Sequence, residues 1–377
     1  MQTLSIFLVF LIVSNTYISS EVEKSNILTG INECISVTYE TTAVVSFPLC
    51  LGFSEIDIKR GLTYTAMINA RGYDPGCRSI HHLLWMMESA IPDSTLHSTY
   101  VDVGAYIGSC VFHMASMGYY VEAIEPFPDF NSVMEATLTL NPTFKHFVSF
   151  HQVLLGSQER YITGNFWHSP TNWPNTGFNP TSDGSYKVRE FPLEDVVGNL
   201  AVSLVKLKCV GCEYSVLKGA ERLLASQRFP IIRMSFEPKT HESHNDVLLL
   251  LNTSGYVLVP DIFPTLHLLH GKLDTTTFPV DHLFGSKRFH LPVNASALDE
   301  AARKILCSPI DLMNFNLREY GQRHTDVVAI ANGLYRKLVE HFLGKDSQCV
   351  LVGWHAHIHS KIGMDAVREG ALKSSKK

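Results

Sequence analysis

The chain has 377 residues, of which 45% are hydrophobic and 18% are charged, and this composition is typical of a globular protein. The length accommodates one large domain, or one domain with sizeable extensions. The formal net charge of −5 argues against a nucleic-acid partner that is held mainly through phosphate contacts.

Residues 1–20 have the features of a signal peptide. Residues 4–13 form an apolar run that is too short for a transmembrane helix but suits the core of a signal peptide. Small polar residues follow, and we expect cleavage near Ser19 or Ser20. The alternatives are a short membrane anchor and a buried N-terminal segment. The signal peptide predicts a location in the secretory-pathway lumen or outside the cell, with membrane contact only through an uncleaved N-terminal segment.

Residues 21–95 are expected to form a cover region on the core. Residues 37–51 are rich in Val, Thr and Phe, which favours one or two strands. Apolar residues recur at helical spacing within residues 79–90, which predicts a helix.

The core begins with a strand that leads into a glycine turn. Residues 99–103 are β-branched or aromatic except for one acid, which suits a strand covered on both faces. Gly104 and Gly108 let the backbone pass close to a ligand, and a helix is expected over residues 109–117. A nicotinamide-binding turn has the spacing G-x-G-x-x-G, whereas Tyr106 stands at the second of these glycines, which argues against a dehydrogenase.

An acidic residue follows the next expected strand. Residues 119–124 predict this strand, and Glu125 ends it. In doubly wound folds an acid at this position accepts hydrogen bonds from the two hydroxyls of a ribose. The glycine turn, helix, strand and acid together predict a nucleoside-containing cofactor that lies across the strand ends.

Strands and helices continue to alternate over residues 96–262, which is the pattern of a parallel sheet. Further strands are expected at 147–151, 203–209, 231–236 and 256–259, and helices at 129–140, 214–225 and 245–253. Residues 163–187 interrupt the alternation with Gly, Pro and aromatic residues, which predicts a long loop. We interpret it as an acceptor-side loop that covers the cofactor; a packed surface excursion is the alternative.

The alternation is lost after residue 262, so residues 263–377 are described as a C-terminal extension whose role the sequence does not reveal. Within it, residues 297–307 and 327–343 are expected to be helical.

Two groups of residues have spacings that metal ligands also show. Cys209 and Cys212 form a C-x-x-C pair, but no second pair stands at the distance of a zinc ribbon. Three histidines alternate near the end of the chain, and on a strand they would share one face: His355, His357 and His359. Exposed or singly bonded histidines are the favoured interpretation, and no metal site is assigned.

The eight cysteines favour disulfide bonds if the chain enters an oxidising compartment. Five of them flank the core and are the better candidates: Cys34, Cys50, Cys77, Cys307 and Cys349. Cys110 lies in the first core helix and is expected to pack as a small apolar residue. Glycosylation triplets at Asn252 and Asn294 fit a secreted glycoprotein.

Three motifs together resemble the FkbM family of methyltransferases. The first is Asp102-Val103-Gly104-Ala105, which matches the start of the family's D-V-G-A-N-I-G turn, and the second is Glu125-Pro126. The third runs from Lys206 to Ala220 and matches the family's K-I-D-x-E-G-x-E-x-x-V-L-K-G-A block. The motifs occur in the family's order, and the resemblance covers about residues 96–240.

This resemblance implies an α/β fold with a Rossmann-like, doubly wound sheet of the seven-stranded methyltransferase type. It also implies S-adenosylmethionine as the cofactor and O-methylation of a small-molecule or glycan acceptor, a sugar in the first place. The residues implied in cofactor binding are Asp102, Gly104, Gly108 and Glu125, where Asp102 contacts the amino-acid end directly or through water.

The candidates for catalysis are Glu213 and Glu237. Both follow the ends of expected strands, where ligands bind in such sheets, and both match acids of the family pattern. Either could position or deprotonate an acceptor hydroxyl. A buried acid that pairs with Lys206 is the alternative.

Three positions depart from the family pattern: Tyr106 replaces Asn, Lys208 replaces Asp and Val210 replaces Glu. The change at Lys208 reverses a charge close to the expected site. Two functions therefore stay open, an S-adenosylmethionine-dependent methyltransferase and a secreted, catalytically inactive binding protein that keeps the fold.

Overall fold

The computed structural model describes residues 31–40, 44–52, 74–91, 99–169, 172–209, 211–235, 241–261, 302–307 and 326–344. Several sequence predictions concern residues outside these ranges: the signal peptide, Glu237, Asn294, Cys349 and the three alternating histidines.

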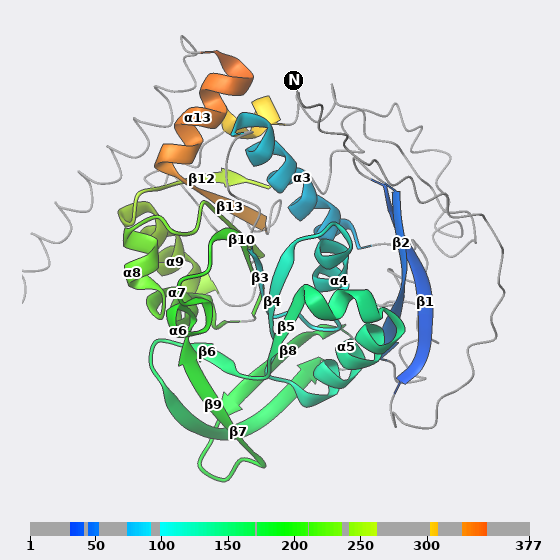
Figure 1. Ribbon diagram of the computed structural model, residues 1–377. Helices are drawn as coiled ribbons and strands as arrows, with labels where there is room; N and C mark the ends of the chain where they lie inside the picture. The colour runs from blue at the N-terminus through cyan, green and yellow to red at the C-terminus, as the bar shows by residue number, and fades with distance from the viewer. Residues whose placement is uncertain are drawn as a thin grey trace, which may run out of the picture.

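A seven-stranded sheet with the order β12-β13-β11-β10-β3-β4-β5 forms the centre of the structure (Figure 1). The parallel strands at its middle are β3 (Thr99–Val103), β4 (Tyr120–Ile124), β5 (Val148–His151), β10 (Val202–Leu207) and β11 (Ile231–Ser235). Near one edge, β13 (Asp326–Ala331) runs antiparallel between β11 and β12 (Tyr256–Pro260). The prediction of a Rossmann-like sheet of the seven-stranded methyltransferase type is confirmed.

The seventh strand comes from the segment that the sequence analysis placed in the C-terminal extension. The prediction of a single helix over residues 327–343 is therefore wrong, because the strand β13 precedes the helix α13 (Asn332–Leu343). Residues 327–331 are buried and pair on both sides, so they carry a continuous apolar run without alternation. Such a run cannot be distinguished from a buried helix by periodicity alone.

Helices cover both faces of the sheet (Figure 1). One buried cluster contains residues of α3 (Pro75–Ala90), α4 (Ser109–Ser116), α5 (Pro128–Leu140) and α13. The opposite cluster contains residues of α6 (Leu193–Val197), α7 (Glu213–Lys218), α8 (Glu221–Ala225) and α9 (His241–Thr253). Successive strand residues join opposite clusters, as Leu204 and Val205 do. No helix in the described ranges combines the length and the apolar character needed to span a bilayer.

The predicted strands near the N-terminus are present as a hairpin of β1 (Ile31–Glu40) and β2 (Val44–Gly52). The hairpin packs against α5, where the Cys50 N–H donates to Thr137 Oγ1 at 2.9 Å. The Asn141 side chain, just after α5 and before the 3₁₀ turn η1 (Pro142–His146), donates to the Pro48 carbonyl at 2.8 Å.

The long loop expected over residues 163–187 is a wrong prediction, because most of these residues belong to a four-stranded sheet. Its order is β6-β9-β7-β8, with β6 (Leu154–Gly156), β7 (Arg160–Ser169), β8 (Asn172–Pro180) and β9 (Tyr186–Pro192). β8 is an edge strand, where proline is tolerated. Gly177 leaves room for the Trp167 ring, since a Cβ at Gly177 would lie 2.7 Å from it. The same Gly and Pro residues that indicate a loop therefore serve edge pairing and aromatic packing.

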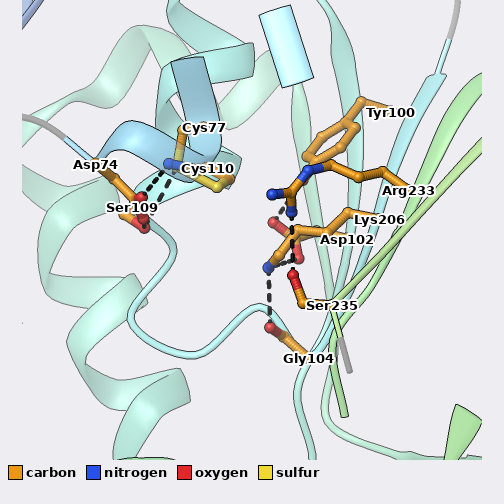
Figure 2. Close-up of a disulfide and its surroundings, with 11 residues drawn as sticks. Asp74, Cys77, Tyr100, Asp102, Gly104, Ser109, Cys110, Lys206, Arg233 and Ser235 are labelled. Atoms are coloured by element: carbon orange, nitrogen blue, oxygen red, sulfur yellow. Dashed lines mark hydrogen bonds and ion pairs between the residues drawn. A yellow bond between two sulfur atoms is a disulfide. The ribbon is translucent and has the colours of Figure 1, made fainter. Parts of the chain in front are cut away.

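Three disulfides have both cysteines within the described ranges. Cys34–Cys50 joins directly paired residues of the hairpin, and Cys77–Cys110 joins α3 to α4 (Figure 2). The expectation that Cys110 packs as a free apolar residue is wrong, since the helix turns this side chain toward α3. Cys209–Cys212 is the third bond. Cys307 is disulfide-bonded as well, so four of the five better candidates are confirmed, and Cys349 lies outside the described residues.

Asn252, which begins one glycosylation triplet, lies in α9 and is only 6% exposed. A glycan needs an accessible amide nitrogen, so the folded structure does not favour modification at Asn252.

Replacing Cys77 and Cys110 with alanine should lower the free energy of unfolding by about 3–4 kcal/mol, because the bond closes a long stretch of the unfolded chain. The sequence separation is 33 residues. Urea titration of the wild type and the variant measures the change, with free thiols alkylated and no oxidant or reductant added. An unchanged midpoint would show that the packing of α3 on α4 does not depend on the bond.

Candidate functional site

A cavity of about 340 Å³ opens at the carboxyl ends of β3, β4 and β10. Ligands bind at this edge in open parallel sheets. Four parts of the chain line the cavity: the glycine turn after β3, the residues after β4, the four-stranded sheet and the loop between β10 and α7. The volume falls in the range of small-molecule sites.

Both predicted glycines are needed for backbone conformation and close packing. Gly104 has φ +76°, and a Cβ there would lie 2.0 Å from the Lys208 carbonyl oxygen. Gly108 has φ +80°, and its Cβ would meet Phe112 and Met134 within 2.8 Å. Gly104 lines the cavity, whereas Gly108 holds the turn against α4 and α5.

Tyr106, the first departure from the family pattern, also has a left-handed backbone with φ 55°. Asparagine adopts this conformation more readily than tyrosine does. The Tyr106 ring packs edge-on against Phe130, with ring centroids 4.4 Å apart, and lines the cavity. The contact with Phe130 stabilises a turn that the tyrosine backbone alone disfavours.

Glu125 lies where the ribose acid was predicted. Its carboxylate accepts hydrogen bonds from the Tyr106 N–H at 2.9 Å and the Phe127 N–H at 3.0 Å, and the residue lines the cavity. Glu125 is only 6% exposed, and this burial raises its pKa to about 7 despite the two backbone donors. Each carboxylate oxygen has a second acceptor direction, so the group can also receive two ligand hydroxyls.

Asp102 is fully buried in a polar network between strands and is not among the residues that line the cavity (Figure 2). Lys206 Nζ donates to Asp102 Oδ1 at 2.5 Å and to the Gly104 carbonyl at 3.1 Å. Tyr100 donates its hydroxyl to Asp102 Oδ2 at 2.9 Å. Burial raises the pKa of Asp102, while Lys206 and Tyr100 act in the opposite direction. In this structure Asp102 positions the glycine turn through Lys206.

Glu213, one candidate for catalysis, is 1% exposed in the first turn of α7 and does not line the cavity. Burial raises its pKa to about 7, while backbone donors at Glu213 and Gly211 lower it. The alternative of a pair with Lys206 does not describe it, because Lys206 contacts Asp102. Glu237, the other candidate, lies outside the described residues.

Sequence reasoning did not assign an aromatic wall that the four-stranded sheet contributes. Phe166 contacts Phe127 with ring centroids 4.9 Å apart and Phe178 with centroids 5.1 Å apart. All three line the cavity beside Glu125. The many aromatic residues within 163–187 were the available signal, although the strands that arrange them were not expected.

A buried acid of the same sheet also reaches the cavity. Glu190 is 6% exposed and accepts a hydrogen bond from Arg160 Nε at 2.5 Å, and both residues line the cavity. Gly156 makes room for this carboxylate, since its Cβ would lie 1.7 Å from Glu190 Oε1. The pair joins β7 to β9, so no local sequence pattern could have indicated it.

The loop after β10 brings Lys208, the position of the charge reversal, to the cavity. Lys208, Cys209 and Cys212 line it. The Lys208 N–H donates to the Val103 carbonyl at 3.0 Å, which fixes this backbone beside the glycine turn.

Residues 102–258 match the family described as the methyltransferase FkbM domain. No curated protein matches the chain. Among solved structures, the methyltransferase FkbM from Methylobacillus flagellatus KT is 20% identical over 43% of this chain and 39% of its own, with a TM-score of 0.32. This chain thus spans less than half of that protein.

Two further solved structures are similar at 12% identity. A precorrin-6y C5,15-methyltransferase from Geobacter metallireducens GS-15 aligns over 48% of this chain and 72% of its own, with a TM-score of 0.29. The METTL16 MTase domain aligns over 58% of this chain and 77% of its own, with a TM-score of 0.33.

Replacing Lys206 with methionine should lower the free energy of unfolding by about 3–5 kcal/mol, because Asp102 would lose its buried cation. The double variant Lys206→Met/Asp102→Asn should recover a large part of this loss, since no uncompensated charge stays buried. Denaturant titration of both variants tests the network. If the single and double variants were equally stable, the ion pair would not govern this region.

Proposed function

We infer that this protein, whose residues 102–258 match the methyltransferase FkbM domain, is a methyltransferase that uses S-adenosylmethionine. The observation that carries the inference is the buried Glu125 carboxylate at the end of β4, beside the glycine turn in a cavity of about 340 Å³. An acid in this place is suited to the two hydroxyls of a ribose.

The residues of the cavity fit the chemical parts of this cofactor. Glu125 would receive the ribose hydroxyls, and the aromatic wall of Phe127, Phe166 and Phe178 would cover the adenine. Gly104 has no side chain, so the backbone of the turn can approach the ligand closely. When bound, S-adenosylmethionine supplies an activated methyl group on a sulfonium centre.

We propose a hydroxylated acceptor, with sugars first, that is methylated on oxygen. The acceptor would enter beside the loop after β10, where Lys208 and Cys212 line the cavity. Among the described carboxylates that line it, Glu190 is the one not committed to the ribose, and it is available to hold an acceptor hydroxyl. Glu213 can act only after the turn that precedes it moves, because the carboxylate is buried.

A catalytically inactive binding protein is the second candidate function, and the position of Lys208 favours it. An ammonium group of Lys208 that faces the ligand would repel the positive sulfonium of S-adenosylmethionine but not the neutral thioether of S-adenosylhomocysteine. The site would then prefer the demethylated ligand over the methyl donor.

For the location of the protein we propose the secretory pathway or the extracellular space. The support is the apolar segment at residues 4–13 together with the three disulfides, since such bonds persist in oxidising compartments.

Calorimetric titration of the folded protein with both S-adenosyl ligands, followed by transfer of a labelled methyl group to a panel of sugars, tests the function. Saturable binding of S-adenosylmethionine with methyl transfer supports the enzyme. Binding without transfer to any hydroxylated acceptor supports the binding protein, and absence of binding to either ligand contradicts both.

The affinity for S-adenosylhomocysteine should depend on pH through Glu125, whose pKa is about 7. Ribose hydroxyls donate to the charged carboxylate, so protonation of Glu125 competes with binding. We expect the affinity to be about tenfold weaker at pH 6 than at pH 8. Glu125→Gln should bind more weakly at pH 8 and lose this dependence. Titrations across pH test this, and an equally steep profile in the variant would remove Glu125 from the ribose site.

Replacing Lys208 with methionine removes the charge and keeps the length of the side chain. Affinity for S-adenosylmethionine should rise by about tenfold relative to S-adenosylhomocysteine, because the repulsion of the sulfonium disappears. Lys145→Met, an exposed residue of η1, is the matched control and should leave the ratio unchanged. An unchanged ratio in Lys208→Met would show that the ammonium group points away from the sulfonium.

A further inference from the structure

The loop between β10 and α7 closes on a disulfide that borders the cavity. Cys209 and Cys212 are both half-buried, and their Cα atoms lie 5.5 Å apart. The Cys212 N–H also donates to the Cys209 carbonyl at 3.3 Å, and Gly211 adopts φ +83°. The bond therefore links the two ends of a tight turn, and both sulfur-bearing residues belong to the cavity wall.

Stability of the fold does not account for this bond. Cys209–Cys212 closes a separation of 3 residues, whereas the other two bonds with both cysteines in the described ranges close 16 and 33. A short closed loop removes little conformational freedom from the unfolded chain. Cys77 and Cys110 are both buried, so a solvent thiol cannot reach their bond in the folded protein, whereas the hairpin bond joins the fully buried Cys50 to the half-buried Cys34.

The turn is in direct contact with the glycine turn of the cavity. The Lys208 N–H donates to the Val103 carbonyl at 3.0 Å, and the Lys208 carbonyl oxygen occupies the place of a Cβ on Gly104. The Gly104 N–H in turn donates to the Ile124 carbonyl at 3.0 Å, one residue before Glu125. A shift of the disulfide turn therefore displaces residues that shape the ligand site.

We propose that Cys209–Cys212 is a thiol–disulfide exchange site for dithiols, and that its reduction weakens ligand binding in the cavity. The thiolate of a dithiol attacks one sulfur, the sulfur–sulfur bond breaks, and the released cysteine thiolate takes up a proton. The second thiol of the reductant then attacks the mixed disulfide and frees the other cysteine. Two electrons and two protons pass to the protein, and the dithiol becomes a disulfide.

Reduction acts on the cavity because two non-bonded sulfur atoms cannot remain at bonding distance. The sulfur atoms must separate, and the turn then loses its covalent closure and keeps only hydrogen bonds, such as the 3.3 Å bond from the Cys212 N–H to the Cys209 carbonyl. In the oxidised protein the disulfide holds this part of the cavity wall in place before the ligand binds. In the reduced protein the ligand must order it, and the free-energy cost of that ordering lowers the affinity. This second part of the proposal rests on the proposed function, since it needs an S-adenosyl ligand as the probe.

The exchange site is tested by graded reduction of the native protein with dithiothreitol, alkylation with N-ethylmaleimide and peptide mapping by mass spectrometry. Cys209 and Cys212 should be labelled at dithiol concentrations that leave the buried Cys77–Cys110 bond intact. Labelling of Cys209 and Cys212 only together with Cys77 and Cys110, or only on unfolding, would overturn the proposal.

The effect on binding is tested by titrating S-adenosylhomocysteine into the oxidised and the selectively reduced protein. Affinity should fall by about tenfold on reduction and return on reoxidation. The variant Cys209→Ser/Cys212→Ser should have the affinity of the reduced protein and should not respond to dithiothreitol. Equal affinity of both wild-type forms, or an equal response of the variant, would overturn the coupling. If the oxidised protein does not bind the ligand at all, the proposed function fails, while the alkylation order still decides the exchange site.

Discussion

The contact between Lys206 and Asp102 organises the functional half of the structure. The two residues lie on the neighbouring central strands β10 and β3, and the same ammonium group also binds the Gly104 carbonyl. Burial of both charges is unfavourable by itself, so the pair is tolerated because the lysine, the aspartate and the Tyr100 hydroxyl satisfy one another. The position of the glycine turn, and with it the shape of the cavity, depends on this arrangement.

Two residues at the glycine turn depart from the FkbM pattern, Tyr106 and Lys208. On one side Tyr106 supplies an N–H to Glu125 and an aromatic contact to Phe130. On the other side the Lys208 backbone packs on Gly104, and Lys208 lines the cavity together with the Cys209–Cys212 disulfide. The end of the cavity beside Glu125 therefore has the acid of the FkbM pattern, while the end beside Lys208 has a reversed charge and a disulfide in its wall.

The sequence was sufficient where a feature is encoded by neighbouring residues. The strand that contains Asp102, the turn at Gly104 and the acid after β4 at Glu125 follow one another closely, and their positions were predicted correctly. Features that depend on contacts between distant residues were missed. The Arg160–Glu190 pair joins two strands of an unexpected sheet, and Cys110 meets Cys77 only after α3 packs on α4. The role of Asp102 shows the same limit, since the sequence does not reveal that Lys206 faces it from the next strand.

The position of β13 has a consequence for the order in which the protein assembles during synthesis. β12 does not pair with β11 directly; β13 lies between them, although it is made after both. While the ribosome is still producing the intervening residues, β11 presents an unpaired apolar edge, and such edges promote association with other chains. A chaperone that shields this edge would therefore matter more for the yield of this protein than for a sheet whose strands pair in the order of their synthesis.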